Sequence, residues 1–177
     1  MANQRLTDKS ALTNHTGTGD LYMIVDVSDT TGSSAGTSKK LDSKFVIQTD
    51  KISVSNAELR SLSSAAKTIV SAPGSGYMIL PLSVQLHCDY GSSTESGNVT
   101  CLVGFALDVN YYWKQKQRVM RSITSDFVYM VDYTATTNPT AGAAPDDLPL
   151  LLFSDSNFSS TDLTMNVYVT YQIVKLS

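Results

Sequence analysis

The sequence has little charge. Only 16% of its 177 residues are charged, whereas about 25% is usual for soluble domains, and the net charge is −3. Bulk electrostatics therefore give no drive toward nucleic acid or toward an anionic membrane surface. We expect neither of these as a partner. A chain of this length favours one core domain with an additional short segment.

Long apolar runs are also missing. No stretch approaches the roughly 18 consecutive apolar residues that a membrane-spanning helix needs. The opening MANQRLTDKS lacks the apolar region of a secretory signal. We therefore expect a protein that is made and kept in a cytoplasm, and whose release from a cell takes another route, such as lysis.

Residues that often carry chemistry are scarce, with two histidines and two cysteines. His15 lies in the polar run NHTGTG, and His87 alternates onto the polar side of a predicted strand, with no nucleophile elbow beside either. Asp146 and Asp147 offer oxygen ligands of the kind calcium uses, but without EF-hand spacing, and we expect them in a solvated loop. We expect no enzyme activity, no cofactor and no metal site.

The first 50 residues differ from the rest. LYMIVDV is strongly β-prone, the following SDTTGSSAGTSKK has the composition of a flexible loop, and LDSKFVI is a second short apolar run. Two short strands cannot form a stable core alone. The segment is either a hairpin folded onto the body or an arm that becomes ordered by pairing with another chain. We assign residues 1–50 to an anchoring arm and 51–177 to the body. The candidate anchoring residues are Leu21, Tyr22, Ile24, Val25 and Val27.

A short helical turn is predicted after the arm. Ser55 and Glu58 have the spacing of a capping box, and Leu59 and Leu62 are three apart, so that both can face a core. The APGSGYM run that follows lacks the Gly-Lys-Ser/Thr ending of a phosphate-binding loop and leads into a strand. We therefore expect a turn there.

Strict period-two alternation marks LPLSVQLHCDY as a half-buried strand. Its predicted apolar face consists of Leu80, Leu82, Val84, Leu86, Cys88 and Tyr90. Pro81 has no backbone donor and should lie at the start of the strand or on an edge. NVTCLVGFALDV and DLTMNVYVTYQIV repeat the alternation, and SDFVYMVDY and LPLLLFS are shorter strand candidates. Several short strands separated by turns predict an all-β, antiparallel, jelly-roll-like β-sandwich.

The strands on either side of GSSTESG are expected to form a hairpin. With the turn between Thr94 and Glu95, Cys88 would lie opposite Cys101 on the apolar face. That separation overlaps the range of a disulfide, but cytosolic thiols are kept reduced. We predict a buried, reduced pair, with a bridge formed after release from the cell as the alternative.

A basic and aromatic run offers a candidate contact surface. Its residues are Tyr111, Tyr112, Trp113, Lys114, Lys116 and Arg118. Such a combination can contact a sugar, a nucleic acid or an acidic neighbouring subunit. It is also typical of a solvated edge strand or loop whose lysines discourage aggregation. Both interpretations stay open here.

Three motifs in order resemble a module of bacteriophage virion proteins. They are a helical turn at Ala57–Leu62, an "IV-x-APG-x-G" loop at Ile69–Gly76, and an apolar strand ending in the "dYGS" motif at Tyr90–Ser92. DLPLLLFSDSNFSSTDLTMNVYVTYQIV is similar to the closing strands of that module. LYMIVDVSDTTGSSAGTSKKLDSKF resembles amino-terminal segments of phage fibres and appendages.

This resemblance implies a β-sandwich subunit of a head fibre, a decoration protein or a tail appendage, located in the virion. It implies capsid or other virion structural proteins as partners, and a homo-oligomer, with a trimer favoured over a dimer. The alternative function is a carbohydrate-binding receptor module of a tail fibre. Tyr111, Tyr112 and Trp113 would then stack on a host-surface glycan.

Overall fold

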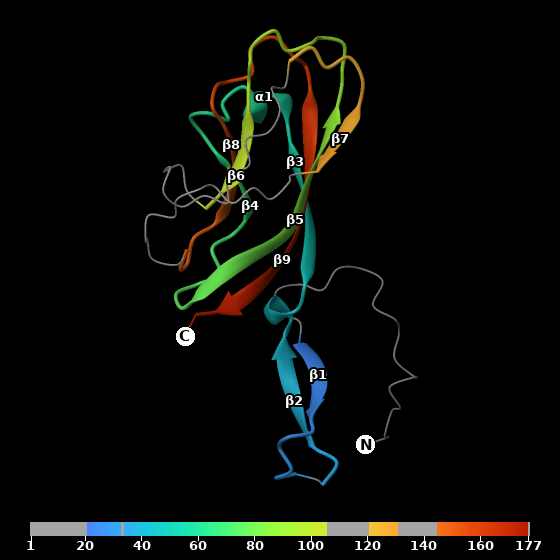
Figure 1. The fold of residues 1–177 in the computed structure, drawn as a ribbon, viewed down its shortest axis with the longest axis vertical. Coiled ribbons are helices and arrows are strands. Elements are labelled where there is room, and N and C mark those ends of the chain that lie inside the picture. The colour runs from blue at the N-terminus through green and yellow to red at the C-terminus, as the bar shows by residue number, and fades with distance from the viewer. Residues whose placement is uncertain (1–20, 33, 106–120, 131–144, 177) are drawn as a thin grey trace. The chain divides into compact units, whose positions relative to one another are not determined.

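The secondary structure of the described residues consists almost entirely of antiparallel β-strands (Figure 1). The computed structural model describes residues 21–32, 34–105, 121–130 and 145–176, and the chain falls into two units, residues 1–46 and 47–177. The first unit contains β1 (Leu21–Asp26), β2 (Thr37–Asp42) and the 3-10 turn η2 (Ser43–Phe45). The second contains β3 (Gln48–Val54), α1 (Asn56–Leu59), β4 (Lys67–Val70), β5 (Tyr77–Asp89), β6 (Cys101–Gly104), β7 (Phe127–Met130), β8 (Leu150–Ser154) and β9 (Thr164–Lys175). The expected all-β class is confirmed.

The second unit is a β-sandwich. One sheet has the strand order β3-β9-β5-β7, and the other has the order β4-β8-β6. Alternate residues of both sheets point into one core, as a half-buried strand requires. Fully buried members include Val84, Leu86, Val167 and Val169 from the four-stranded sheet and Cys101, Leu150 and Leu152 from the three-stranded sheet. The predicted sandwich is therefore confirmed.

The long pair β5–β9 contains a bulge that the sequence pattern did not reveal. The pairing register shifts between Pro81 and Ser83, so one extra residue, Leu82, stands in β5. The extra residue reverses the alternation, so Pro81 is buried while Leu80 and Leu82 are exposed. The predicted apolar face is therefore right for Val84, Leu86 and Cys88 and wrong for Leu80 and Leu82, while Tyr90 lies beyond the end of β5 and is half-buried.

The surroundings of Pro81 agree with its missing backbone donor. Among the described strands, β7 pairs with β5 only from Gln85 to Cys88. At Pro81 the described partner of β5 is thus β9 alone. Pro81 occupies an edge-like position inside a long strand, as its chemistry requires.

The predicted hairpin that places Cys88 opposite Cys101 is wrong. Cys88 in β5 pairs with Met165 and Phe127, whereas Cys101 in β6 pairs with Ser154 of the other sheet. The segment between β5 and β6 crosses from one sheet to the other instead of turning back. The predicted burial is confirmed, because both side chains are free thiols with no exposed surface. Burial raises the pKa of Cys88 to about 12, and it also raises the pKa of Cys101.

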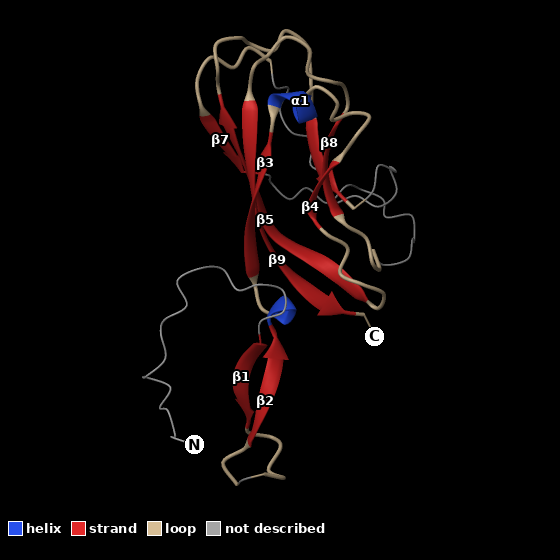
Figure 2. Cartoon of the chain, turned by 180° about the vertical axis from the view of Figure 1, so that it is seen from behind, coloured by secondary structure: helices blue, strands red, loops and turns tan. Residues whose placement is uncertain are grey.

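Helix α1 begins at the predicted capping box. The Ser55 hydroxyl accepts a hydrogen bond from the Glu58 N–H, and the Glu58 carboxylate accepts one from the Ser55 N–H. Leu59 and Leu62 are fully buried, as predicted. The Arg60 guanidinium donates to the Ser159 and Thr161 carbonyls, so α1 is tied to the segment before β9 at one end of the sandwich (Figure 2).

A buried carboxylate holds two loops together near that helix. Glu95 is only 3% exposed. Its side chain accepts hydrogen bonds from the N–H groups of Gly97 at 2.8 Å, Ser159 at 2.9 Å and Ser160 at 3.2 Å. Burial by itself raises the pKa of Glu95, but these donors outweigh burial and lower the pKa to about 2. The ionised side chain is therefore the form that the fold stabilises.

A second carboxylate makes a similar connection beside it. Asp162 accepts hydrogen bonds from the N–H groups of Ser92 at 2.7 Å and Ser93 at 2.9 Å. A Cβ on Gly91 would lie 2.5 Å from the Asp162 carboxyl carbon, which is closer than real contacts allow. A side chain at position 91 would therefore have to push the Asp162 carboxylate away from its N–H donors.

Replacing Glu95 with glutamine should lower the free energy of unfolding by about 2 kcal/mol at pH 7, because a charged acceptor of several N–H groups is lost. The folded pKa lies below the ordinary value of 4.5, so the stabilisation is complete above that pH and is lost as the pH falls toward 2. Urea unfolding followed by circular dichroism at pH 7, 5, 3 and 2 measures this. The wild-type and Glu95→Gln values should converge at the acid end. Equal stabilities at pH 7 would show that Glu95 does not pin the loops.

Candidate functional site

The candidate anchoring residues lie in the hairpin of the first unit. Strands β1 and β2 pair in antiparallel register from Leu21 opposite Asp42 to Asp26 opposite Thr37. Four of the predicted residues are in β1, namely Leu21, Tyr22, Ile24 and Val25. Val27 follows β1 directly, and its side chain is 76% exposed. The β-prone run was therefore correctly predicted to be a strand, and it leads into an exposed apolar side chain.

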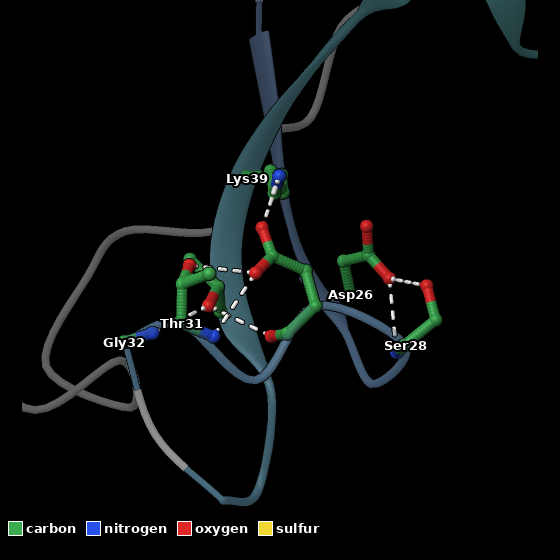
Figure 3. Close-up of polar contacts among 7 residues, drawn as sticks. Asp26, Ser28, Thr31, Gly32 and Lys39 are labelled. Carbon is green, nitrogen blue, oxygen red and sulfur yellow. Dashed lines mark hydrogen bonds and ion pairs between the residues drawn. The ribbon is translucent and has the colours of Figure 1, made fainter.

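The loop that joins β1 to β2 is organised by two aspartates (Figure 3). Asp26 accepts hydrogen bonds from the N–H and the hydroxyl of Ser28, at 3.0 and 2.6 Å. Asp29 accepts the corresponding pair from Thr31, at 3.1 and 2.6 Å. Carboxylate bonds to the backbone two residues later are a common way to fix a turn. The predicted flexible loop thus has a defined pattern of hydrogen bonds.

Two residues of strand β2, Thr37 and Lys39, also contact this loop. The Lys39 ammonium forms an ion pair with Asp29 at 2.5 Å. The Thr37 hydroxyl donates to the Asp29 carbonyl at 2.8 Å and accepts from the Gly32 N–H at 3.1 Å. The Lys39 ion pair, followed by the hydroxyl and N–H of Thr31, lowers the pKa of Asp29 to about 2. The charged form of Asp29 therefore holds both ends of the loop.

Asp146 and Asp147 hold a turn together, a role that the sequence did not suggest. Asp147 accepts a hydrogen bond from the Gly74 N–H at 2.8 Å, and Asp146 accepts one from the Gly76 N–H at 2.7 Å. Both glycines have positive φ, of 99° and 82°, which a side chain would disfavour. The described residues contain no group of three or more His, Cys, Asp or Glu side chains that could hold a metal ion.

His87 lies on the outer face of its sheet, as predicted. Its Nδ1 is 3.4 Å from Asp89, and Asp89 also accepts a hydrogen bond from the Asn166 amide at 3.1 Å. The adjacent thiol of Cys88 is buried in the core on the opposite face of β5. The strand therefore separates the imidazole from the nearest thiol in the sequence.

The basic and aromatic run lies outside the described residues. This applies to Tyr111, Tyr112, Trp113, Lys114, Lys116 and Arg118. Their role as a contact surface stays a prediction. Within the described part of the chain, no helix has the length and apolar character needed to cross a membrane.

Comparison with known proteins gives little to build on. No family model matches the sequence, and no curated protein matches it. Among solved structures, the chain is similar to one described as "Cyanophage Pam1 capsid asymmetric unit", with 15% identity and a TM-score of 0.41 over 100% of both chains. A likeness at that level is too low to establish a shared fold or a shared role.

Titration of Asp29 tests the geometry of the hairpin loop. The carboxyl ¹³C shift of Asp29 should titrate with a midpoint near pH 2, below the ordinary value of 3.8. In the Lys39→Gln variant the midpoint should rise toward 3.8, because the ammonium group that lowers the pKa of Asp29 most is gone. Lys44→Gln is the matched control, since Lys44 lies beside Asp42 instead and its removal should leave the midpoint unchanged. A wild-type midpoint near 3.8 would refute the ion pair.

Proposed function

We propose that this protein is a structural component of a bacteriophage particle and not an enzyme. It forms a homo-oligomeric head fibre or decoration, and its amino-terminal arm anchors that assembly to the virion. It is made in the host cytoplasm and acts in the particle. Its partners are copies of itself, with a trimer favoured, and capsid or other virion structural proteins.

The observation that carries this proposal is the division of the chain into a hairpin and a sandwich. The first unit contains two strands of six residues each, which is too little to form a stable core in water. Such a hairpin gains stability by adding its strands to another protein. The aspartates of its loop preserve its form until that partner is met. A preformed two-stranded arm of this kind suits docking on a larger assembly.

The sandwich supports the proposal through its core. The described core residues run from Ile52 to Ile173, so the second unit supplies its own core. The motifs that resemble phage virion proteins fall at defined places in it. The helical turn is capped by Ser55, the glycine turn is held by Asp146 and Asp147, and the "dYGS" motif packs its Ser92 against Asp162. The resembling residues thus maintain the form of the body.

Deletion of residues 1–46 tests the role of the arm. The truncated chain keeps β3 whole, including the hydrogen bond from the Tyr171 hydroxyl to Gln48. It should fold with a thermal midpoint within a few degrees of the full chain, and it should form the same oligomer. Its binding to particles produced without this protein should fall at least tenfold, as measured by co-sedimentation.

Deletion of residues 1–20 is the matched control, because it removes chain but keeps the β1–β2 hairpin. This variant should bind particles as the full chain does. Undiminished binding after deletion of residues 1–46 would refute the anchor. A monomeric truncated body would place oligomerisation in the arm and would contradict the division of roles.

A further inference from the structure

We infer that copies of this chain associate through the outer face of the β3-β9-β5-β7 sheet. This inference rests on the proposed homo-oligomer and names the surface that forms it. The outer face is the side of the sheet turned away from the core. Its members alternate with the buried residues of each strand.

Large apolar side chains are exposed on this face. Leu80 and Leu82 of β5 are 40% and 45% exposed, and Val128 and Met130 of β7 are 60% and 51% exposed. The bulge in β5 is what turns Leu80 and Leu82 outward. Exposed apolar side chains that are grouped on one surface mark an interaction site more often than scattered ones do.

The strand register places Met130 in a row of residues that crosses the whole sheet. Met130 lies opposite Gln85, Gln85 lies opposite Tyr168, and Tyr168 lies opposite Lys51. Residues directly opposite each other share one face of a sheet. The Lys51 ammonium stands 5.8 Å from the centre of the Tyr168 ring. The row thus runs across all four strands, from an apolar end at β7 to a charged end at β3.

The other sheet differs in this respect. Leu102 of β6 and Phe153 of β8 lie opposite each other, and both stand outside the core cluster between the sheets. They are nevertheless only 8% and 5% exposed. The outer face of the three-stranded sheet therefore leaves these two side chains covered. Among the described strands of the sandwich, the large apolar side chains that are exposed belong to the four-stranded sheet.

The distribution of charged residues on this face favours a second copy of the chain as the partner. On this face Lys51 lies on the edge strand and Asp89 lies at the end of β5, so the middle of the face has neutral residues such as Gln85 and Thr170. A face that is neutral at its centre meets its own copy without like charges coming together. Interface centres are depleted of charge and enriched in tyrosine and methionine, which this face offers in Tyr168 and Met130.

The size of the face also suits a stable oligomer. The strands β3, β9, β5 and β7 have 7, 12, 13 and 4 residues. At about 3.3 Å per residue and about 4.8 Å between strands, they cover roughly 600 Å² in plan. Side chains add relief to that area, and a standard interface buries about 800 Å² of accessible surface per partner. Two copies can meet face to face, or three can turn this face toward a common axis.

Charge insertion on the face tests the inference. Leu80→Glu and Met130→Glu, made separately in the full chain, should each raise the dissociation constant of the oligomer at least 100-fold. Light scattering at micromolar concentration should then report the mass of a single chain. Both positions are exposed, so the circular dichroism spectrum should not change. Val27→Glu is the matched control for the mass alone, since it changes a more exposed apolar side chain in the first unit and should leave the oligomer mass unaltered.

Oxidation of methionine gives a second measurement that needs no variant. Met130 should react with hydrogen peroxide at least tenfold more slowly in the concentrated oligomer than in dilute protein. The buried Met165 should react slowly at both concentrations and serves as the reference.

The possible outcomes separate the two proposals. A wild-type chain that is monomeric at micromolar concentration would refute the proposed homo-oligomer and this inference together. An oligomer that survives both charged variants, with Met130 oxidised equally fast at both concentrations, would refute the surface alone. Variants that stay oligomeric but no longer bind particles would show that another virion protein covers the face, which also overturns the inference.

Discussion

The antiparallel pairing of β5 with β9 is the constraint on which the body depends. β9 also pairs with β3, and β5 also pairs with β7, so each strand of the larger sheet is attached through this pair. The two strands supply many of the fully buried side chains, among them Val84, Leu86, Val167 and Val169. The paired residues are far apart in the sequence, since Tyr77 lies opposite Lys175 and Asp89 lies opposite Thr164. Contacts of such long sequence separation form slowly, because a large loop must close first.

The sequence predicted those features that depend on neighbouring residues. Alternation identified β5 and β9, and the spacing of Ser55 and Glu58 identified the start of α1. The bulge was missed because the composition around Leu82 continues the same alternation, and only the register of β9 reveals the extra residue. The cysteine pairing was missed because alternation gives the face of a strand and not its partner. The segment that crosses between the sheets carries Glu95, whose N–H donors Ser159 and Ser160 lie 64 and 65 residues away in the sequence.

In the candidate site, too, the features set by neighbouring residues were predicted and the contacts between distant residues were not. The strand that contains Leu21 to Val25 followed from local β propensity, whereas the carboxylate bonds of Asp29 depend on how β2 returns beside it. Asp146 and Asp147 meet the glycine turn from about 70 residues away, and no local pattern encodes that contact. The basic and aromatic run around Trp113 remains a sequence prediction, because it lies outside the described residues.

The loop carboxylates have a consequence for how the protein responds to salt. Glu95 and Asp162 are satisfied by backbone N–H groups, and no described ion pair joins the loops that they connect. Ionic screening weakens exposed pairs of opposite charge much more than short hydrogen bonds from backbone N–H groups to a buried or half-buried carboxylate, such as Glu95 or Asp162. This end of the sandwich therefore keeps its form in dilute and in concentrated electrolyte alike.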